Sequence, residues 1–341
     1  MVCEHLASFE HHKFKRDISM KFLAVFSVII FGVSTQISAQ SQTFPNRPIT
    51  LINPYAAGGP ADLLGRALGK ALAEQLGQPV VVENRPGGGA SIGAAYVAKS
   101  APDGHTLLLG TAAAHTVTPL ATKVAYDGIQ DFEFVGMVAN VPNLLTVHPS
   151  STASTLNELI ALAKAQPGKL SYASAGLGSS PHVGAELFKY RTKIFMTHIP
   201  YRGAAPAAND LVAGYVPVGM LNVSGVLPFV KAGRLKAIAI AGASRSALLP
   251  DVPTFAEAGL PNFVAGSWYS LAAPAKTPSA VLDSLAKALA TVQTQPEFLA
   301  ITSAQSAEIL KLSRAETRKF VQDDGRATAE LIKATGLKLN D

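Results

Sequence analysis

Cysteine is nearly absent from this sequence: among its 341 residues, Cys3 is the only one. Cys3 lies within the segment that we expect to be removed on export, so the remaining chain has no disulfide, no thiolate nucleophile and no cysteine for a lipid anchor. Its stability must therefore come from a hydrophobic core. The chain is long for a single core, which favours two domains.

Charge is sparse as well. Charged residues make up 15% of the chain and the formal net charge is +6, with no basic run and no interleaving of basic and aromatic residues. This composition argues against nucleic acid as a partner, while a mild positive balance favours small anions. After the N-terminal segment, no uninterrupted apolar stretch is long enough to span a bilayer.

The N-terminal residues have the composition of a secretory signal peptide. Phe22–Ser34 is an uncharged apolar stretch with a basic flank before it and a small residue, Ala39, after it. We expect residues 1–39 to be removed on export to the periplasm. Because Met20 lies just before the stretch, residues 1–19 are a candidate mis-called extension. The alternative is that the apolar stretch forms a buried helix.

Short apolar runs alternate with helix-like segments, a pattern typical of α/β domains with mostly parallel sheets. Strands are expected at 49–52, 80–83, 106–109, 134–138, 144–148, 171–173, 194–199, 216–221 and 237–241. Helices are expected at 61–76, 91–99, 155–166, 181–190, 205–213 and 227–232, and almost throughout 278–336. No linker marks a single domain boundary, as expected where the chain crosses between domains more than once.

Neither a metal site nor a cofactor site is indicated. His, Asp, Glu and Cys residues do not cluster at the spacing of metal ligands. A glycine cluster follows the strand expected at 80–83, but Gly87, Gly89 and Gly93 lack the G-x-G-x-x-G spacing of a dinucleotide-binding loop. We interpret the cluster as a structural turn, with dinucleotide binding as a weak alternative, and expect no cofactor.

The first candidate site is a strand–turn–helix near the start of the expected mature chain. The pair Gly58 and Gly59 allows a close backbone approach, and Pro60 suits the first helical turn. Free N–H groups and the positive end of the helix then form a cradle for an anion. Asp62 either caps this helix or belongs to the site, and it can pair with Arg66. Since no cation is present to neutralise a phosphate, a water-assisted grip on a carboxylate is favoured.

A second anion cradle is predicted at the turn after residues 171–173. Ser174 ends that strand, Ser179 can cap the next helix, and His182 lies in the first turn of the helix. The turn lacks the G-x-S-x-G of a serine hydrolase and His182 has no visible acid partner, so we interpret His182 as a binding or capping residue. Thr111 lies at the end of another expected strand, where ligands of open α/β sheets collect.

A further turn, Tyr201-Arg202-Gly203, follows the strand expected at 194–199. The guanidinium of Arg202 is suited to pair with a carboxylate through two hydrogen bonds. A solvated surface charge is the preferred interpretation.

Together these segments closely resemble one family, the solute-binding proteins of tripartite tricarboxylate transporters, also called the Bug or TctC family. The resemblance covers essentially the whole expected mature chain in order. It rests on residues 53–111, YASAGLGSSPHVGAELF at 172–188, IPYRGAAPAANDLVAG at 199–214, residues 227–263, and SWYSLAAPAKTP at 267–278.

The resemblance implies a periplasmic binding protein type 2 fold, in which two α/β domains enclose a ligand cleft. Domain I would comprise residues 42–146 and 269–341, and domain II residues 147–268. One ligand carboxylate would be held through loop backbone and ordered water. The implied ligand-binding residues are Tyr55, Ala57, Gly58, Gly59, Asp62, Thr111, Ser174, Gly178, Ser179, His182, Tyr201, Gly203 and Asn222.

The implied function is capture of a small organic carboxylate by a monomeric, non-catalytic protein and its delivery to the membrane permease subunits. One alternative is a sensor that presents its closed form to a membrane sensor kinase, and another is an exported serine hydrolase. Three positions depart from the family pattern: Pro217 replaces a frequent acidic residue, Ser270 replaces a glycine, and His105 replaces a tyrosine. These departures leave the identity of the ligand open.

Overall fold

Strands and helices alternate along residues 44–336, the part of the chain that the computed structural model describes. The expected signal peptide, residues 1–39, lies outside the described residues. The strands are β1 Ile49–Asn53, β2 Val80–Asn84, β3 Thr106–Thr111, β4 Phe132–Val147, β5 Ser171–Ser174, β6 Thr197–Pro200, β7 Val218–Asn222, β8 Lys236–Ile240, β9 Gly266–Pro274 and β10 Glu308–Ile309. The helices are α2 Pro60–Leu76, α3 Ser91–Ala98, η1 Ala113–Val117, α4 Thr118–Ala121, α5 Leu156–Ala165, α6 Ser180–Thr192, α7 Ala204–Val212, α8 Val223–Lys231, α9 Ser279–Val292, α10 Pro296–Ser303 and α11 Arg314–Thr335.

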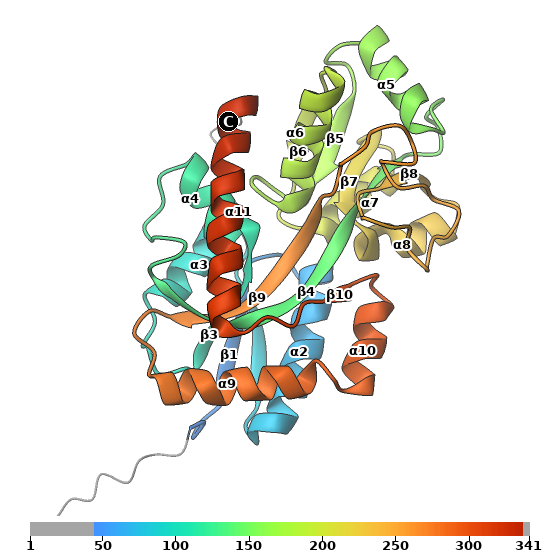
Figure 1. Cartoon of the computed structure of the whole chain (residues 1–341). Helices are drawn as coiled ribbons and strands as arrows, with labels where there is room; N and C mark the ends of the chain where they lie inside the picture. The colour runs from blue at the N-terminus through green and yellow to red at the C-terminus, as the bar shows by residue number, and fades with distance from the viewer. Residues whose placement is uncertain (1–43, 337–341) are drawn as a thin grey trace, which may run out of the picture. The chain divides into compact units, whose positions relative to one another are not determined.

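The long strand β4 belongs to two sheets, as Figure 1 shows. Up to Pro142 it pairs with β9, and from Asn143 onward it pairs with β7 and β8. We call the part built on the first sheet, residues 44–142 and 266–336, lobe 1. The part built on the second sheet, residues 143–265, is lobe 2. The strand order through both lobes is β2-β1-β3-β9-β4-β7-β5-β6, with β8 and β10 attached to β4.

Each sheet is buried on both faces. Along β1, Leu51 packs into a core with α2 and α9, whereas its neighbour Ile52 packs into a second core with α3 and η1. In lobe 2, one core contains residues of α5 and α6 and another contains residues of α7 and α8. Strands covered on both faces form continuous apolar runs, which explains why the expected strands stand out in the sequence.

The expectation of mostly parallel sheets is correct only for the outer strands. β1 is parallel to β2 and β3, and β5 is parallel to β6 and β7, but β4 and β9 are antiparallel to their neighbours. Strand β9 was not predicted, because it contains no β-branched residue. Strand β4 was predicted as two separate strands on either side of Pro142. The strand in fact continues through Pro142, which lies where β4 passes from one sheet to the other, and the missing N–H of proline is tolerated there.

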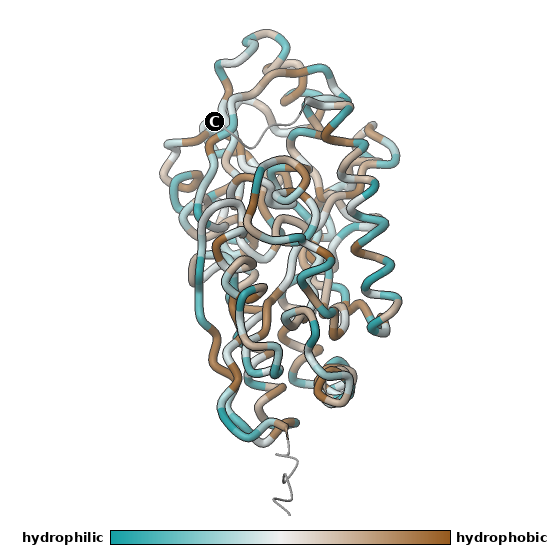
Figure 2. The backbone as a smooth tube through the Cα atoms, turned by 90° about the vertical axis from the view of Figure 1, so that its left-hand side faces the viewer, coloured by the Kyte–Doolittle hydropathy of each residue, from teal (hydrophilic) through white to brown (hydrophobic). Residues whose placement is uncertain are grey.

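The C-terminal segment is less helical than expected, since β10 separates α10 from α11 and pairs with β4 at Ala139 and Asn140. In the described residues, no helix combines the length and the apolar character needed to cross a membrane. Figure 2 is consistent with this, because hydrophobic and hydrophilic residues alternate along the tube.

Candidate functional site

A narrow cavity lies where the starts of four helices meet, one from lobe 1 and three from lobe 2. Only about 20 Å³ of it is wide enough for the centre of a water molecule, so the cavity has room for a small group and not for an extended chain. It is lined by Tyr55, Gly59, Pro60, Ala61, Thr111, Ala175, Ser179, Pro181, Ala204, Asn222, Ser267 and Tyr269.

Three of the four helices begin without a side-chain cap. Gly59 precedes α2 and Gly203 precedes α7, and neither has a side chain that could cap; Asn222 precedes α8, but its side chain accepts no hydrogen bond from the helix. Only α6 is capped, because Ser179 Oγ accepts a hydrogen bond from the backbone N–H of His182 at 3.4 Å. The first N–H groups of an α-helix have no partner within the helix, so the uncapped starts leave donors available beside the cavity.

The helix starts approach one another closely across the two lobes. A Cβ atom placed on Gly59 would lie 3.7 Å from the backbone nitrogens of both Ala204 and Ala205. One placed on Gly225, in the first turn of α8, would lie 3.3 Å from Pro60. Each helix start carries roughly half a positive charge, so the positive ends of α2, α7 and α8 repel one another unless an anion lies between them.

The side chains around the cavity are uncharged. None of the residues that line it is Lys, Arg, His, Asp or Glu. Burial raises the pKa of Tyr55 to about 12, even though the contact of its hydroxyl with Thr111 Oγ1 at 3.4 Å lowers it slightly. Burial also raises the pKa of Tyr269. Both phenols therefore stay neutral and able to donate hydrogen bonds, and the positive potential of the site comes from the backbone.

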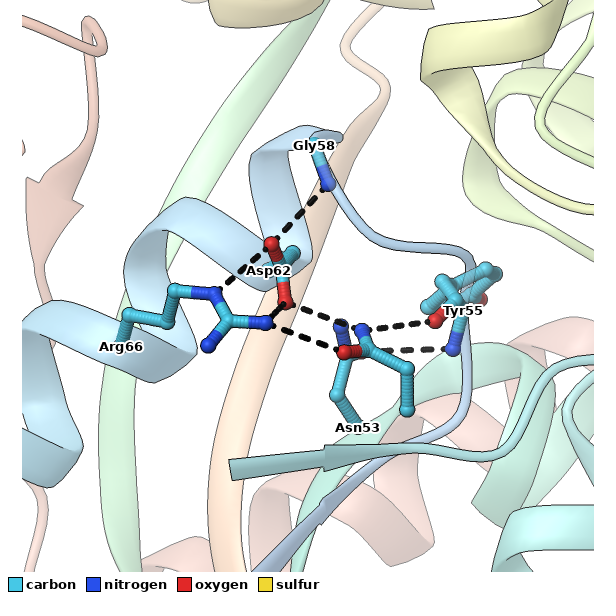
Figure 3. Close-up of polar contacts among 6 residues, drawn as sticks. Asn53, Tyr55, Gly58, Asp62 and Arg66 are labelled. Atoms are coloured by element: carbon cyan, nitrogen blue, oxygen red, sulfur yellow. Dashed lines mark hydrogen bonds and ion pairs between the residues drawn. The ribbon is translucent and has the colours of Figure 1, made fainter. Parts of the chain in front are cut away.

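Asp62 does not line the cavity; its carboxylate instead holds the loop that leads into α2 (Figure 3). The carboxylate accepts hydrogen bonds from the backbone N–H of Gly58 at 2.9 Å, from Arg66 Nε at 3.0 Å and from Asn84 Nδ2 at 2.9 Å. Asn84 Nδ2 also donates to the carbonyl oxygen of Tyr55 at 3.0 Å. Burial alone would raise the pKa of Asp62, but the hydrogen bonds from Arg66, Gly58 and Asn84 lower it.

Two histidines hold the corresponding loop of lobe 2. His182 Nδ1 accepts a hydrogen bond from the backbone N–H of Gly178 at 3.1 Å, and His198 Nε2 lies 2.7 Å from Ser174 Oγ. The two imidazole rings stack with their centroids 3.9 Å apart. Burial, with a smaller effect of Lys189, lowers the pKa of His182 to about 4. Burial and the neighbouring His182 lower the pKa of His198 to about 3, so both rings are neutral at pH 7.

The side-chain amide of Asn222 is used within the protein. Its Nδ2 lies 3.1 Å from the carbonyl oxygen of Val141, 2.9 Å from Asn143 Oδ1 and 3.0 Å from Ser267 Oγ. β4 and β9, which carry these partners, are where the chain passes between the lobes. Asn222 therefore ties both crossings to the start of α8 and contacts the cavity beside that start.

The structure brings together five of the residues predicted for the site. Tyr55, Gly59, Thr111, Ser179 and Asn222 line the cavity. The remaining predicted residues are not among its lining, and several of them shape the loops around it: Ala57, Gly58, Asp62, Ser174, Gly178, His182, Tyr201 and Gly203.

Several lining residues were missed by the sequence analysis. Pro181 lies next to the predicted His182 and Ala204 next to the predicted Gly203, and neither has a polar side chain that would have drawn attention to it. Ser267 and Tyr269 occupy alternate positions on β9, the strand that was not predicted, and so face the same side. The aromatic pair Trp268-Tyr269 was the available signal for this strand.

Comparison with known proteins gives a consistent result. The model of the tripartite tricarboxylate transporter family receptor (TctC) matches residues 64–337. Protein BugT of Bordetella pertussis (strain Tohama I) is 36% identical over 321 residues, which cover 94% of this chain and 98% of BugT.

Two solved structures are similar along their whole length. Rpa4515 of R. palustris with adipate has a TM-score of 0.83 and 33% identity, covering 86% of this chain and 99% of the other. The periplasmic binding protein BugD has a TM-score of 0.82 and 32% identity, covering 86% and 99%. These similarities confirm the predicted two-lobed α/β fold of periplasmic binding proteins.

Proposed function

The chain belongs to the family of tripartite tricarboxylate transporter receptors, and from this membership we propose that it captures a small organic carboxylate and delivers it to the permease subunits of such a transporter. One observation carries the proposal: the positive ends of α2, α7 and α8 converge on a cavity whose side chains are uncharged. A carboxylate accepts hydrogen bonds from the free N–H groups at these helix starts. Its negative charge also offsets the repulsion between the positive helix ends.

Both the lining of the cavity and the solved structure of a relative support a carboxylate as the ligand. The cavity has neither a lysine nor an arginine to balance a phosphate, and its size suits a single carboxylate group. The relative Rpa4515 carries adipate, a carboxylate. We propose that Tyr55, Thr111 and Ser179 contact the bound carboxylate, while Asp62 and His182 hold the loops that present the donors.

The domain limits and the site of action are also part of the proposal. Residues 42–146 with 269–341, and residues 147–268, would form the two domains; the change of sheet at Pro142 and Asn143 lies close to the first limit. Residues 1–39 would direct the protein to the periplasm, where BugD, as a periplasmic binding protein, also acts. The protein would act as a monomer.

We propose that the protein is not an enzyme, and the geometry of Ser179 and His182 supports this. Ser179 Oγ donates a hydrogen bond to the carbonyl oxygen of Gly176 at 2.7 Å, and the ring of His182 accepts one from Gly178. A serine nucleophile would need its hydroxyl bonded to the imidazole of the base. Here both groups are occupied with holding the loop.

A thermal-shift panel of carboxylates, each beside its primary amide, tests the proposal. With a carboxylate at about 100 times its Kd, we expect a gain of about 2.7 kcal/mol in the free energy of unfolding, and no gain with the matched amide. Mass spectrometry of the purified protein identifies any carboxylate that co-purifies. If no carboxylate raises the melting temperature and none co-purifies, the proposal is wrong.

A further inference from the structure

A second hollow lies beside the cavity, and the proposed function does not yet use it. In this outer groove about 340 Å³ is wide enough for the centre of a water molecule, compared with about 20 Å³ in the cavity. Tyr55 and Ala175 line both spaces and therefore separate them. A ligand whose carboxylate enters the cavity has little room there for the rest of its chain, whereas the groove on the other side of Tyr55 is open.

Three segments form the groove: the glycine cluster, which the sequence indicates to be a structural turn, and two turns in which the sequence places candidate ligand-binding residues. From lobe 1 comes the glycine cluster Gly87–Ala90, and from lobe 2 come Gly176-Leu177 and Tyr201-Arg202. The lobes touch here: the backbone N–H of Ala56 donates to the carbonyl oxygen of Arg202 at 3.0 Å.

The glycine cluster brings its backbone very close to lobe 2. A Cβ atom on Gly89, whose φ is +60°, would lie 2.8 Å from the carbonyl oxygen of Leu177. A side chain at this position would separate the loop from lobe 2, and the left-handed backbone would itself be strained. The walls of the groove therefore come from both lobes in contact, like the walls of the cavity.

Arg202 is the one charged residue among those that line the groove. Its side chain is exposed, and in the described part of the chain its guanidinium has no hydrogen-bond or ion-pair partner. The neighbouring Tyr201 is already used, because its hydroxyl donates to Asp210 Oδ2 at 2.7 Å. The cavity with its uncharged lining and the groove with its one charged residue are thus neighbouring but chemically different spaces.

We propose that the outer groove binds the far end of the ligand and that Arg202 selects ligands in which this end is anionic. Resting on the proposed function, this assigns an elongated dicarboxylate, with one carboxylate at the helix starts and the other on the guanidinium of Arg202. A planar guanidinium binds a carboxylate through two parallel hydrogen bonds, which distinguishes an acidic end from an alkyl end.

Calorimetric titration with a chain-length series of straight α,ω-dicarboxylates, each beside the monocarboxylate of equal length, tests the assignment. We expect the wild-type protein to bind a dicarboxylate long enough to reach the groove about fivefold to tenfold more tightly than its monocarboxylate. Arg202→Gln should remove this preference and leave monocarboxylate binding unchanged, and Arg202→Lys should keep part of it. Arg234→Gln, at another exposed arginine that does not line the groove, is the matched control.

The outcomes separate the groove from the cavity. If no chain length shows a preference for the dicarboxylate, or if Arg202→Gln weakens both ligands of a pair equally, the assignment of the groove is overturned while carboxylate binding stands. If no carboxylate of either kind binds, the proposed function itself fails, and the groove assignment fails with it.

Discussion

The two loops that meet at the cavity are held by chemically different groups. In lobe 1, an ionised carboxylate, Asp62, gathers the N–H of Gly58 and the side chains of Arg66 and Asn84. In lobe 2, two neutral histidines accept or share hydrogen bonds with Gly178 and Ser174. One loop thus depends on a group staying charged, and the other on two groups staying uncharged.

The difference matters because the two kinds of group respond to pH in separate ranges. A carboxylate whose pKa is lowered on folding loses its stabilising effect only below its ordinary value, 3.8 for Asp62. A histidine kept neutral by burial begins to cost stability as soon as the unfolded chain takes up protons, below 6.5. Acidification should therefore weaken the loop of lobe 2 before the loop of lobe 1.

The largest effect is expected from Asp62→Ala. The change removes a buried carboxylate that accepts three hydrogen bonds, and it leaves the N–H of Gly58 and one N–H of Asn84 without this acceptor, so the free energy of unfolding should fall by about 2–4 kcal/mol in urea denaturation. Arg66→Gln is the control: the side chain of Arg66 is 53% exposed, and its loss should cost about 1 kcal/mol or less. Equal losses for the two variants would contradict a loop organised by the carboxylate.

A smaller effect, confined to acidic pH, is expected from His182→Gln. In the wild type, the unfolded chain binds a proton at His182 below pH 6.5 while the folded protein does not until about pH 4. The free energy of unfolding should therefore fall across this range, and His182→Gln should reduce the fall by about 1–3 kcal/mol.

Asp62→Asn is the matched variant in the other loop. Asp62 has an ordinary pKa of 3.8 and a lower one in the folded protein, so this variant should alter the slope of stability against pH only below about 3.8. Chemical denaturation at a series of pH values measures both curves. If the two variants change the slope in the same range, the two loops do not differ in the way described.

The smallest effect is expected from Ser179→Ala. Ser179 caps α6, and its replacement should cost about 1 kcal/mol of stability as measured by urea denaturation. The corresponding position of lobe 1, Gly59, has no side chain to cap α2, so only lobe 2 can be weakened in this way. A loss well above this value would mean that the hydrogen bond from Ser179 Oγ to the carbonyl oxygen of Gly176 contributes more to stability than the cap does.

Much of the site was visible in the sequence because each half of it is local. The strand, the glycine pair and Pro60 lie within a few residues of one another, and the same is true of Ser174, Ser179 and the helix that follows. Helix starts obey short-range rules of capping and backbone freedom, so Gly59 and Ser179 were predicted next to helix starts, where the structure has them.

The parts that were not predicted depend on contacts between distant residues. The start of α8 was expected at residue 227 but lies at Val223, and Asn222 before it directs its amide toward β4 and β9 and does not cap the helix. The carboxylate of Asp62 accepts a hydrogen bond from Asn84, which is distant in the sequence, as well as from residues close to it in the sequence. No local sequence pattern indicates the contact with Asn84. Strand β9 has weak local preference and is fixed by pairing with β3 and β4.

The sequence by itself determined the alternation of strands and helices, the turns that open α2 and α6, and the family. Only the tertiary structure decided which of these helix starts face one another. The convergence of α2, α7 and α8 on one uncharged cavity requires β4 and β9 to carry the chain between the lobes, and so does the placement of Arg202 beside it. Short-range propensity determines where each helix begins and therefore which N–H groups are free. Which of these free N–H groups point toward the same cavity depends on packing between distant parts of the chain.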